Sequence, residues 1–430
     1  MIPEIEKASL KEIKAFQEEK LKDLLAYLSE NSSYYKRVFE ENEIDINTIN
    51  SLEDLTKIPT TNKDQLQQFN DDFLCVPKLK IIDYVTTSGT LGDPVTFALT
   101  NNDLERLAYN EAISFACAGV QHDDVLQLMT TMDRRFMAGL AYFLGIRKLG
   151  AGIIRVGAGI PELQWDSILK FKPTYLIAVP SFLLKLIEYA KLHKIDINAS
   201  GIKGVICIGE PLREQDFSLN TLSKKIKADW NIELFSTYAS TEMNTAFTEC
   251  EKLQGGHHHP ELIIVEILND DNKPVGKNEV GELTITTLGV EAMPLLRFKT
   301  GDMVKAHTSV CDCGRNTLRL GPVVGRKKQM IKYKGTTLYP PAMRNILNDF
   351  NDVENYIIEI SHNDIGTDEI LIKIATQLPT QNLLQNIKDH FRAKLRVTPK
   401  IEFHNKKDIQ KLQFPRLSRK PIVVIDKRKV

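Results

Sequence analysis

The stretch Tyr175–His193, YLIAVPSFLLKLIEYAKLH, begins with a short apolar run and continues as an amphipathic one, and Gly204–Glu210, GVICIGE, follows as a second short apolar run. Short apolar runs are typical of buried strands, whereas apolar residues at three- and four-residue spacing among charges predict a helix. A strand, a helix and a strand in this order form a βαβ unit, whose two strands lie parallel in one sheet. The segment therefore predicts an α/β fold.

The same alternation extends to both sides of this unit, from residue 80 to about residue 240. The first forty residues read as helices, residues 260–335 read as strands separated by turns, and the residues after Gly325 show a mixed α+β pattern. We therefore predict an α/β protein with a large N-terminal domain, residues 1–325, of parallel-rich sheets and helices. A small α+β C-terminal domain, residues 326–430, follows it.

The composition argues against several classes of protein, among them nucleic-acid-binding, membrane-spanning and disulfide-rich proteins. Lys plus Arg and Asp plus Glu each number 56, so the formal net charge is zero, which argues against a nucleic-acid-binding surface as the main function. The N-terminus lacks the basic and apolar regions of a signal peptide, and the most apolar stretch, Tyr175–Ile187, is too short to span a bilayer. Six cysteines in so long a chain are no disulfide framework. We expect a cytoplasmic protein that binds neither nucleic acid nor membrane.

The residues Thr86–Pro94, TTSGTLGDP, form a loop rich in Gly, Ser and Thr between a predicted strand and a later helix. Backbone N–H groups and hydroxyls in such a loop can bind an anion, and glycine allows the backbone to approach it closely. The loop lacks the Gly-Lys-Ser/Thr of a Walker A motif. Taken alone, it fits a phosphate-binding loop or a polar surface turn.

Four further motifs follow in order along the chain. They are Tyr238–Glu242 (YASTE), residues 281–304 (GELTITTLGVEAMPLLRFKTGDMV), Cys311–Pro340 (CDCGRNTLRLGPVVGRKKQMIKYKGTTLYP) and residues 417–426 (LSRKPIVVID). With the polar loop, they resemble the adenylate-forming superfamily, most closely the phenylacetate–coenzyme A ligase family. The resemblance includes the N-terminal segment and runs over nearly the whole chain.

The resemblance implies a two-step ligase. A carboxylic acid attacks the α-phosphate of ATP to give acyl-AMP and pyrophosphate, with Mg²⁺ at the phosphates, and the thiol of coenzyme A then displaces AMP. Both steps concentrate negative charge on oxygen atoms, so electrostatic stabilisation should dominate. The resemblance also implies that the C-terminal domain is mobile, rotating about a hinge at Lys328 between the two steps. A homodimer is expected because relatives often form one.

The family also implies a role for individual residues. The phosphate-gripping loop would be Thr87, Ser88, Gly89, Thr90 and Gly92, although Asp93 stands where the family usually has lysine. Tyr238 would pack on adenine, Thr241 would contact the α-phosphate and Glu242 would ligate Mg²⁺. The nucleotide-binding set is completed by Ala239, which replaces the family's glycine, and by Ser240, Glu210 and Pro211.

Three more assignments come from the later motifs. Asp302 would accept hydrogen bonds from the ribose hydroxyls, as an ionised carboxylate does well. Arg326 would add a ribose or phosphate contact. Lys420 would bridge the carboxylate and the α-phosphate during adenylation, since a point charge on a long side chain suits that role.

A metal site is predicted by cysteine spacing. Cys311 and Cys313 form a tight thiolate pair, and Cys250 lies upstream, shortly before His257, His258 and His259. Three thiolates and one imidazole suit a structural, tetrahedral Zn²⁺. Alignment with the family favours His257 as the fourth ligand, with His259 as the alternative. The other interpretation is two free thiols in a turn beside a solvated histidine run.

The substrate is less well specified. The acid pocket should be lined by residues 130–140, 155–160 and 208–212, where this chain departs from the phenylacetate enzymes, most clearly at Arg134 and Arg135. We expect an aryl or related carboxylic acid. Two alternatives stay open: transfer of the acyl group to a carrier-protein thiol, and a nucleotide-binding protein that has lost catalysis, which Asp93 and Ala239 would suggest.

Overall fold

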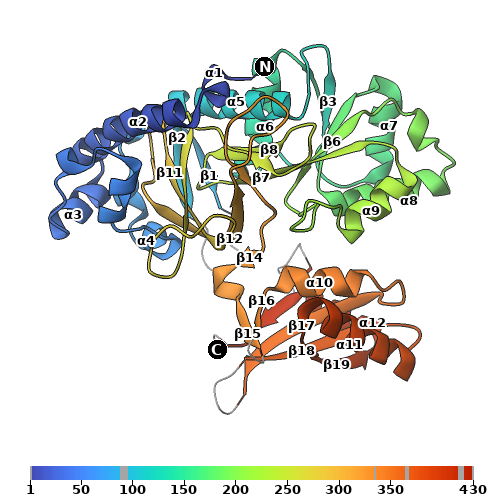
Figure 1. Cartoon of the computed structure of the whole chain (residues 1–430). Helices are drawn as coiled ribbons and strands as arrows, with labels where there is room; N and C mark the ends of the chain where they lie inside the picture. The colour runs from blue at the N-terminus through green and yellow to red at the C-terminus, as the bar shows by residue number, and fades with distance from the viewer. Residues whose placement is uncertain (1, 88–94, 334–335, 364–367, 415–420, 429–430) are drawn as a thin grey trace. The chain divides into compact units, whose positions relative to one another are not determined.

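The computed structural model describes residues 2–87, 95–333, 336–363, 368–414 and 421–428 (Figure 1). The chain divides into two compact units, Met1–Pro322 and Val323–Val430. The boundary expected from the sequence, between Gly325 and Arg326, falls among the first residues of the second unit.

The first unit begins with helices α1 (Glu4–Lys7), α2 (Leu10–Asn31), α3 (Ser33–Glu41) and α4 (Lys63–Gln68). Capping boxes fix where two of these helices start: Ser9 and Glu12 form one at α2, and Asn62 and Gln65 form one at α4. The α2 face with Leu21, Leu25 and Leu28 is almost fully buried. The predicted N-terminal helices are therefore confirmed.

Parallel strands form one half of the main sheet, in the order β4-β3-β5-β6-β7. The strands are β3 (Val125–Leu128), β4 (Gly152–Arg155), β5 (Tyr175–Ala178), β6 (Gly204–Ile208) and β7 (Glu233–Ser240). Helix α5 (Asn101–Cys117) precedes β3, and the intervening helices are α6 (Met137–Leu149), α7 (Pro161–Phe171), α8 (Pro180–Leu192) and α9 (Thr221–Asp229). The segment 175–210 is thus the predicted βαβ unit, β5–α8–β6.

Helices cover both faces of these parallel strands. On β5, Leu176 and Ala178 belong to the apolar core with α7, α8 and α9, whereas Tyr175 and Ile177 belong to the core with α5 and α6. Successive side chains of a strand point to opposite faces, so a strand buried on both sides reads as a continuous apolar run. This is why YLIA, and likewise GVICI in β6, carries no polar alternation.

The other half of the sheet is antiparallel. From β7 it continues through β8 (Thr245–Glu249), β9 (Gly256–His257), β13 (Arg319–Leu320), β12 (Phe298–His307), β11 (Val280–Thr287) and β10 (Ile263–Leu268). A separate hairpin contains β1 (Ile81–Thr86) and β2 (Thr96–Thr100). The polar loop therefore joins two antiparallel strands, and α5 follows only after β2.

The second unit is α+β, as predicted. Its main sheet has the order β19-β18-β17-β20, formed by β17 (Asn355–His362), β18 (Asp368–Ala375), β19 (Lys400–His404) and β20 (Val424–Asp426). The remaining elements are β14 (Gly325–Arg326), β15 (Ile331–Tyr333), β16 (Thr336–Leu338), α10 (Pro340–Asn348), α11 (Gln381–Leu395) and α12 (Lys406–Gln413). Ile358, Ile372 and Phe391 are fully buried in its core. Among the described helices of either unit, we find none with the length and apolar character needed to span a bilayer.

Helix α5 packs closely against α6 and carries a buried carboxyl group. Glu111 is 5% exposed, and a Cβ placed on Gly145 of α6 would lie 2.2 Å from the Glu111 Cβ, so only glycine fits there. The Asn110 amide donates a hydrogen bond of 3.0 Å to Glu111 Oε1. Burial raises the pKa of Glu111 to about 8, so the carboxyl is largely protonated at neutral pH.

This raised pKa predicts a pH-dependent stability. The folded chain binds the Glu111 proton more tightly than the unfolded chain does. The stability that this proton contributes is therefore fully present below the ordinary pKa of 4.5 and is lost as the pH rises towards 8. Glu111→Gln has no carboxyl group to ionise, so its stability should not fall in this way. As the pH rises from 5 to 8, we expect the free energy of unfolding of Glu111→Gln to increase by on the order of 3 kcal/mol relative to that of the native chain. Urea unfolding at several pH values measures this. Glu19→Gln, at an exposed site on α2, serves as the control, and parallel stability profiles for the native chain and Glu111→Gln would contradict the prediction.

Candidate functional site

Two of the residues predicted to bind the nucleotide meet at the end of β7. The Tyr238 hydroxyl donates a hydrogen bond of 2.8 Å to Asp302 Oδ2, across from β12. Burial, and then the negative charge of Asp302, raises the pKa of Tyr238 well above its ordinary value, so the phenol remains a donor. The structure thus brings together an aromatic ring and a carboxylate from separate motifs.

The turn after β7 carries Thr241 and Glu242, both half-buried. Lys63 Nζ, from the first residue of α4, lies 3.9 Å from Glu242 Oε1, which is an ion pair but too long for a hydrogen bond. Sequence reasoning missed Lys63, because a lone lysine at a helix start carries no functional signal. Only the fold brings residue 63 beside residue 242.

A buried arginine forms hydrogen bonds with the residues at the end of this turn. Arg106, on α5, donates hydrogen bonds to the carbonyl oxygens of Asn244 (2.6 Å), Leu262 (2.6 Å) and Leu288 (2.6 Å) and to the Thr245 hydroxyl (3.2 Å). Burial lowers the pKa of Arg106 to about 10, which still leaves it cationic at neutral pH. Asn244 adopts a left-handed conformation with φ of 49°, so Arg106 helps to hold a backbone geometry that most residues avoid.

Glu210 lies just beyond the carboxyl end of β6, the strand next to β7. Its carboxylate accepts hydrogen bonds from the Ser181 N–H (2.8 Å) and hydroxyl (2.9 Å), and it therefore faces the positive end of α8. Pro211 is exposed, and its carbonyl accepts a hydrogen bond of 2.7 Å from the Asn220 amide. Ligands of open α/β sheets bind at the carboxyl ends of such strands. Glu210 and Tyr238 are thus on the edge of the sheet where a ligand is expected.

Several predicted residues are not brought into this group. Ser88, Gly89, Thr90, Gly92 and Lys420 lie outside the described residues. Thr87 is buried, and its hydroxyl and N–H both bond to the backbone of Val95. Ala239 is exposed, and Ser240 Oγ accepts the Met243 N–H at 3.3 Å, which makes Ser240 part of the turn.

Arg326 and Lys328 belong to the second unit. Arg326 is in β14, and Lys328 is in a single 3₁₀ turn, Lys327–Gln329. Both side chains are exposed. The roles expected for them, as a nucleotide contact and as a hinge, stay predictions.

The two arginines near the expected acid pocket differ in their surroundings. Arg134 and Arg135 are both left-handed, with φ of 62° and 59°. The Arg134 side chain is 63% exposed beside Asp133, as expected of a surface charge. Arg135 lines a hollow of about 350 Å³ with Tyr84, Met132 and other residues, and its carbonyl accepts the Thr86 N–H at 3.0 Å.

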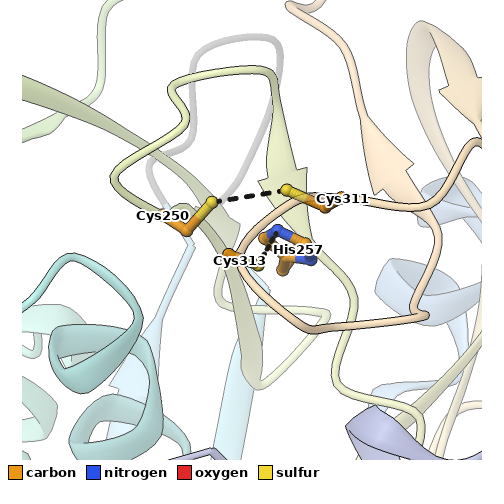
Figure 2. A group of neighbouring side chains, drawn as sticks. All are labelled: Cys250, His257, Cys311 and Cys313. Carbon is orange, nitrogen blue, oxygen red and sulfur yellow. Dashed lines mark hydrogen bonds between the residues drawn. The ribbon is translucent and has the colours of Figure 1, made fainter.

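The predicted metal ligands do come together. Figure 2 shows Cys250, His257, Cys311 and Cys313 converging, and their four ligand atoms all lie within 4.8 Å of one another. The Cys250 and Cys311 sulfurs are 3.7 Å apart, and Cys313 Sγ is 3.4 Å from His257 Nε2. A hydrogen bond from Cys250 and another from His257 hold the pKa of Cys313 below its ordinary value. We call this group the metal cluster.

The structure also distinguishes the two candidate histidines. His257 Nδ1 lies 3.0 Å from the Thr317 hydroxyl, which orients the ring with Nε2 towards the cysteines. His259 instead bonds through Nδ1 to Glu6 and through Nε2 to Ser114, at 3.2 Å. All three histidines are buried, so the interpretation of a solvated histidine run is wrong. The fourth member of the metal cluster is His257.

Comparison with known proteins agrees with these features. Residues 41–292 match the model of the AMP-binding enzyme family. The chain is 29% identical to the phenylacetate-coenzyme A ligase of Thermus thermophilus, over 88% of this chain and 84% of the relative, and 27% identical to that of Escherichia coli, over 83% and 81%. These matches confirm the resemblance inferred from the motifs.

A solved structure confirms the fold. 2-Hydroxyisobutyryl-CoA ligase in the postadenylation state superimposes with a TM-score of 0.84 at 21% identity, over 99% of this chain and 92% of that one. At that identity the likeness concerns the fold alone. The shared fold includes a C-terminal α+β domain, as the sequence predicted.

The Tyr238–Asp302 hydrogen bond predicts a measurable coupling. We expect Tyr238→Phe to lower the free energy of unfolding by about 1.5 kcal/mol, because Asp302 loses a charge-assisted hydrogen bond. In the Asp302→Asn background the same substitution should have a smaller effect, measured by urea unfolding in a double-mutant cycle. Tyr84→Phe, 49% exposed, is the control. Additive effects of the two substitutions would contradict a direct interaction.

Proposed function

Because this chain belongs to the AMP-binding enzyme family, we propose that it is an AMP-forming ligase that activates an aryl or related carboxylic acid with ATP and transfers the acyl group to coenzyme A. The observation that carries this proposal is the grouping at the carboxyl end of β7. There Tyr238 bonds to Asp302, and Glu242 is paired with Lys63. The family supplies the reaction, and these residues supply the means of binding its nucleotide.

The Tyr238–Asp302 pair suits the nucleoside half of ATP. An ionised carboxylate can accept several hydrogen bonds at once, so Asp302 can receive the Tyr238 hydroxyl together with a ribose hydroxyl. The hydrogen bond to Asp302 holds the Tyr238 hydroxyl in place and so restricts the far end of the side chain. A fixed aromatic ring can stack on adenine with little loss of side-chain freedom.

The turn after β7 suits the phosphates. The acid's carboxylate oxygen attacks the α-phosphorus and pyrophosphate leaves, so charge builds up on the α-phosphate oxygens, where the Thr241 hydroxyl can donate. Glu242 offers carboxylate oxygens of the kind that Mg²⁺ prefers, and when bound the ion would neutralise phosphate charge. The thiol of coenzyme A then attacks the acyl carbon, and AMP leaves with the electron pair of the broken bond.

Lys63 compensates for a departure from the family pattern. Asp93 occupies the position where related chains usually carry a lysine, and a carboxylate beside phosphates is unfavourable. Lys63 places an ammonium group 3.9 Å from Glu242, which is within reach of phosphates bound there. We therefore assign to Lys63 the phosphate-binding charge that the loop lacks.

The metal cluster suits a structural Zn²⁺. Three thiolate sulfurs and one imidazole nitrogen are the ligands that zinc prefers, and four protein ligands fill a tetrahedral shell. The cluster joins the loop after β8 to the turn between β12 and β13. Zinc there would brace the antiparallel half of the sheet and take no part in the chemistry.

The acceptor, the oligomeric state and the location are the remaining parts of the proposal. Coenzyme A is favoured over a carrier-protein thiol because the relatives are coenzyme A ligases. A protein that had lost catalysis would have no need for Thr241, Glu242 and Asp302 at one edge of the sheet. The homodimer and the cytoplasmic location stay predictions.

The first test is acid-dependent ATP–pyrophosphate exchange with aryl, aliphatic and dicarboxylic acids. We expect exchange with aryl or related acids and a loss of about 100-fold or more in Lys420→Ala, because the lysine would stabilise charge in the transition state. Lys63→Met should also lower exchange, whereas Lys36→Met, at an exposed site on α3, should not. ATP binding without exchange for any acid would indicate a protein that has lost catalysis.

The metal proposal is tested by elemental analysis. We expect about one zinc per chain in the purified protein and a loss of most of it in Cys313→Ser, because removing one of four ligands opens the shell. Cys75→Ser is the control, since Cys75 is buried outside the metal cluster and bonds to the Phe73 carbonyl. Equal zinc content in all three proteins would contradict the site.

A further inference from the structure

A buried ion pair lies between the loop that carries Glu210 and the metal cluster. Arg213 Nε donates to Glu249 Oε1 at 2.7 Å, and the two side chains are 6% and 1% exposed. A buried pair gains little net stability, because removing both charges from water offsets their attraction. Its placement is therefore more informative than its strength.

Arg213 ties the Glu210 loop to β7. Its guanidinium also donates to the carbonyl oxygens of Leu234 on β7 (3.1 Å) and of Phe217 (3.3 Å). The neighbouring Leu212 carbonyl accepts the Asn220 N–H at 2.9 Å. The position of the loop relative to the strand that carries Tyr238 thus depends on this side chain.

Glu249 connects β7 to the loop that begins at Cys250 and ends at His257, two of the four members of the metal cluster. It is the last residue of β8 and precedes Cys250, and its Oε2 accepts the Ser236 N–H at 2.9 Å, shortly before Tyr238 in β7. Its Oε1 also accepts the Gly255 N–H at 3.3 Å, shortly before His257. Glu249 therefore contacts both ends of the loop that separates two members of the cluster.

Gly255 brings this loop into close contact with β13, and only glycine fits at the position. Its φ is 93°, and a Cβ at this position would lie 2.7 Å from the Leu320 carbonyl oxygen. A metal ion that fixes Cys250 and His257 would consequently fix the Gly255 N–H. That N–H in turn fixes the carboxylate of Glu249.

We propose that Arg213 and Glu249 are positioning residues that link the nucleotide site to the metal cluster, so that metal occupancy and nucleotide affinity depend on each other. The proposal rests on the proposed function of both sites. Metal binding would fix the loop from Cys250 to His257, and the Gly255 N–H of that loop bonds to Glu249. Glu249 in turn bonds to Arg213 and to the Ser236 N–H of β7, and these contacts position Glu210 and Tyr238. Such coupling is reciprocal: whatever factor the metal adds to AMP affinity, AMP adds to metal affinity.

The first experiment measures AMP affinity by calorimetry in Glu249→Gln, which preserves the shape of the side chain and removes its charge. The matched control is Asp124→Asn, whose carboxylate is likewise buried, at 2% exposed, and bonds to Lys203 at 2.7 Å, but at the amino end of β3, away from the nucleotide site. We expect a loss of about fivefold or more in Glu249→Gln and less than about twofold in the control. Equal effects in the two variants would overturn the positioning role.

The second experiment measures the linkage itself. Zinc is titrated at equilibrium against a chromophoric chelator, with and without saturating AMP, in the native chain, Glu249→Gln and Asp124→Asn. We expect AMP to raise zinc affinity about fivefold or more in the native chain and the control, and this ratio to fall towards one in Glu249→Gln. A variant that only loosens the fold would release zinc more readily with and without AMP, leaving the ratio unchanged, which would overturn the linkage.

The outcomes separate this inference from the function it rests on. A chain that binds AMP but holds no zinc would overturn the metal site and the linkage together, leaving the AMP affinity of Glu249→Gln to decide the positioning role. A chain that holds zinc but binds no nucleotide would overturn the proposed function. Zinc retention unaffected by AMP in the native chain would overturn the linkage alone.

Discussion

The pairing of β7 is the constraint on which the rest of the first unit depends. The strand runs parallel to β6 on one side and antiparallel to β8 on the other, so it is the point where the sheet changes direction. Polar residues at its carboxyl end cannot be covered by a crossover helix, because the chain returns at once as β8. Tyr238, Thr241 and Glu242 are therefore available to a ligand.

Buried guanidinium groups connect the segments around this strand. Arg106 joins α5 to the turn after Glu242, Arg213 joins the Glu210 loop to β7 and β8, and Arg315 joins Glu6 (2.7 Å) to Cys313 (3.5 Å). Arginine suits this use because one planar side chain offers five N–H donors and keeps its charge when buried. Apart from the contact between Arg315 and Cys313, these pairings join segments that are distant in the sequence, so the site depends on contacts across the first unit.

The chemistry of the site is divided between two kinds of donor. The carboxylate of Glu242 and the nearby hydroxyl of Thr241 suit a hard cation at phosphates, whereas the thiolates of the metal cluster suit zinc. Glu242 follows β7 and Cys250 follows β8, so the two sets lie on neighbouring strands, yet their donor atoms differ enough that neither metal should displace the other. On the proposed function, the arrangement separates a nucleotide site, whose ligand must exchange, from a zinc site that need only hold the sheet together.

Sequence alone determined the features that depend on local pattern. The run YLIAVPSFLLKLIEYAKLH predicted β5 and α8 because periodicity reports burial, and five ordered motifs predicted the family, Tyr238, Glu242 and Asp302. Tertiary structure decided what depends on side chains meeting across the fold: His257 and not His259 in the metal cluster, Lys63 beside Glu242, and Arg213 with Glu249. No local pattern specifies these contacts, because each is set by packing of distant segments and not by the propensity of the residues themselves.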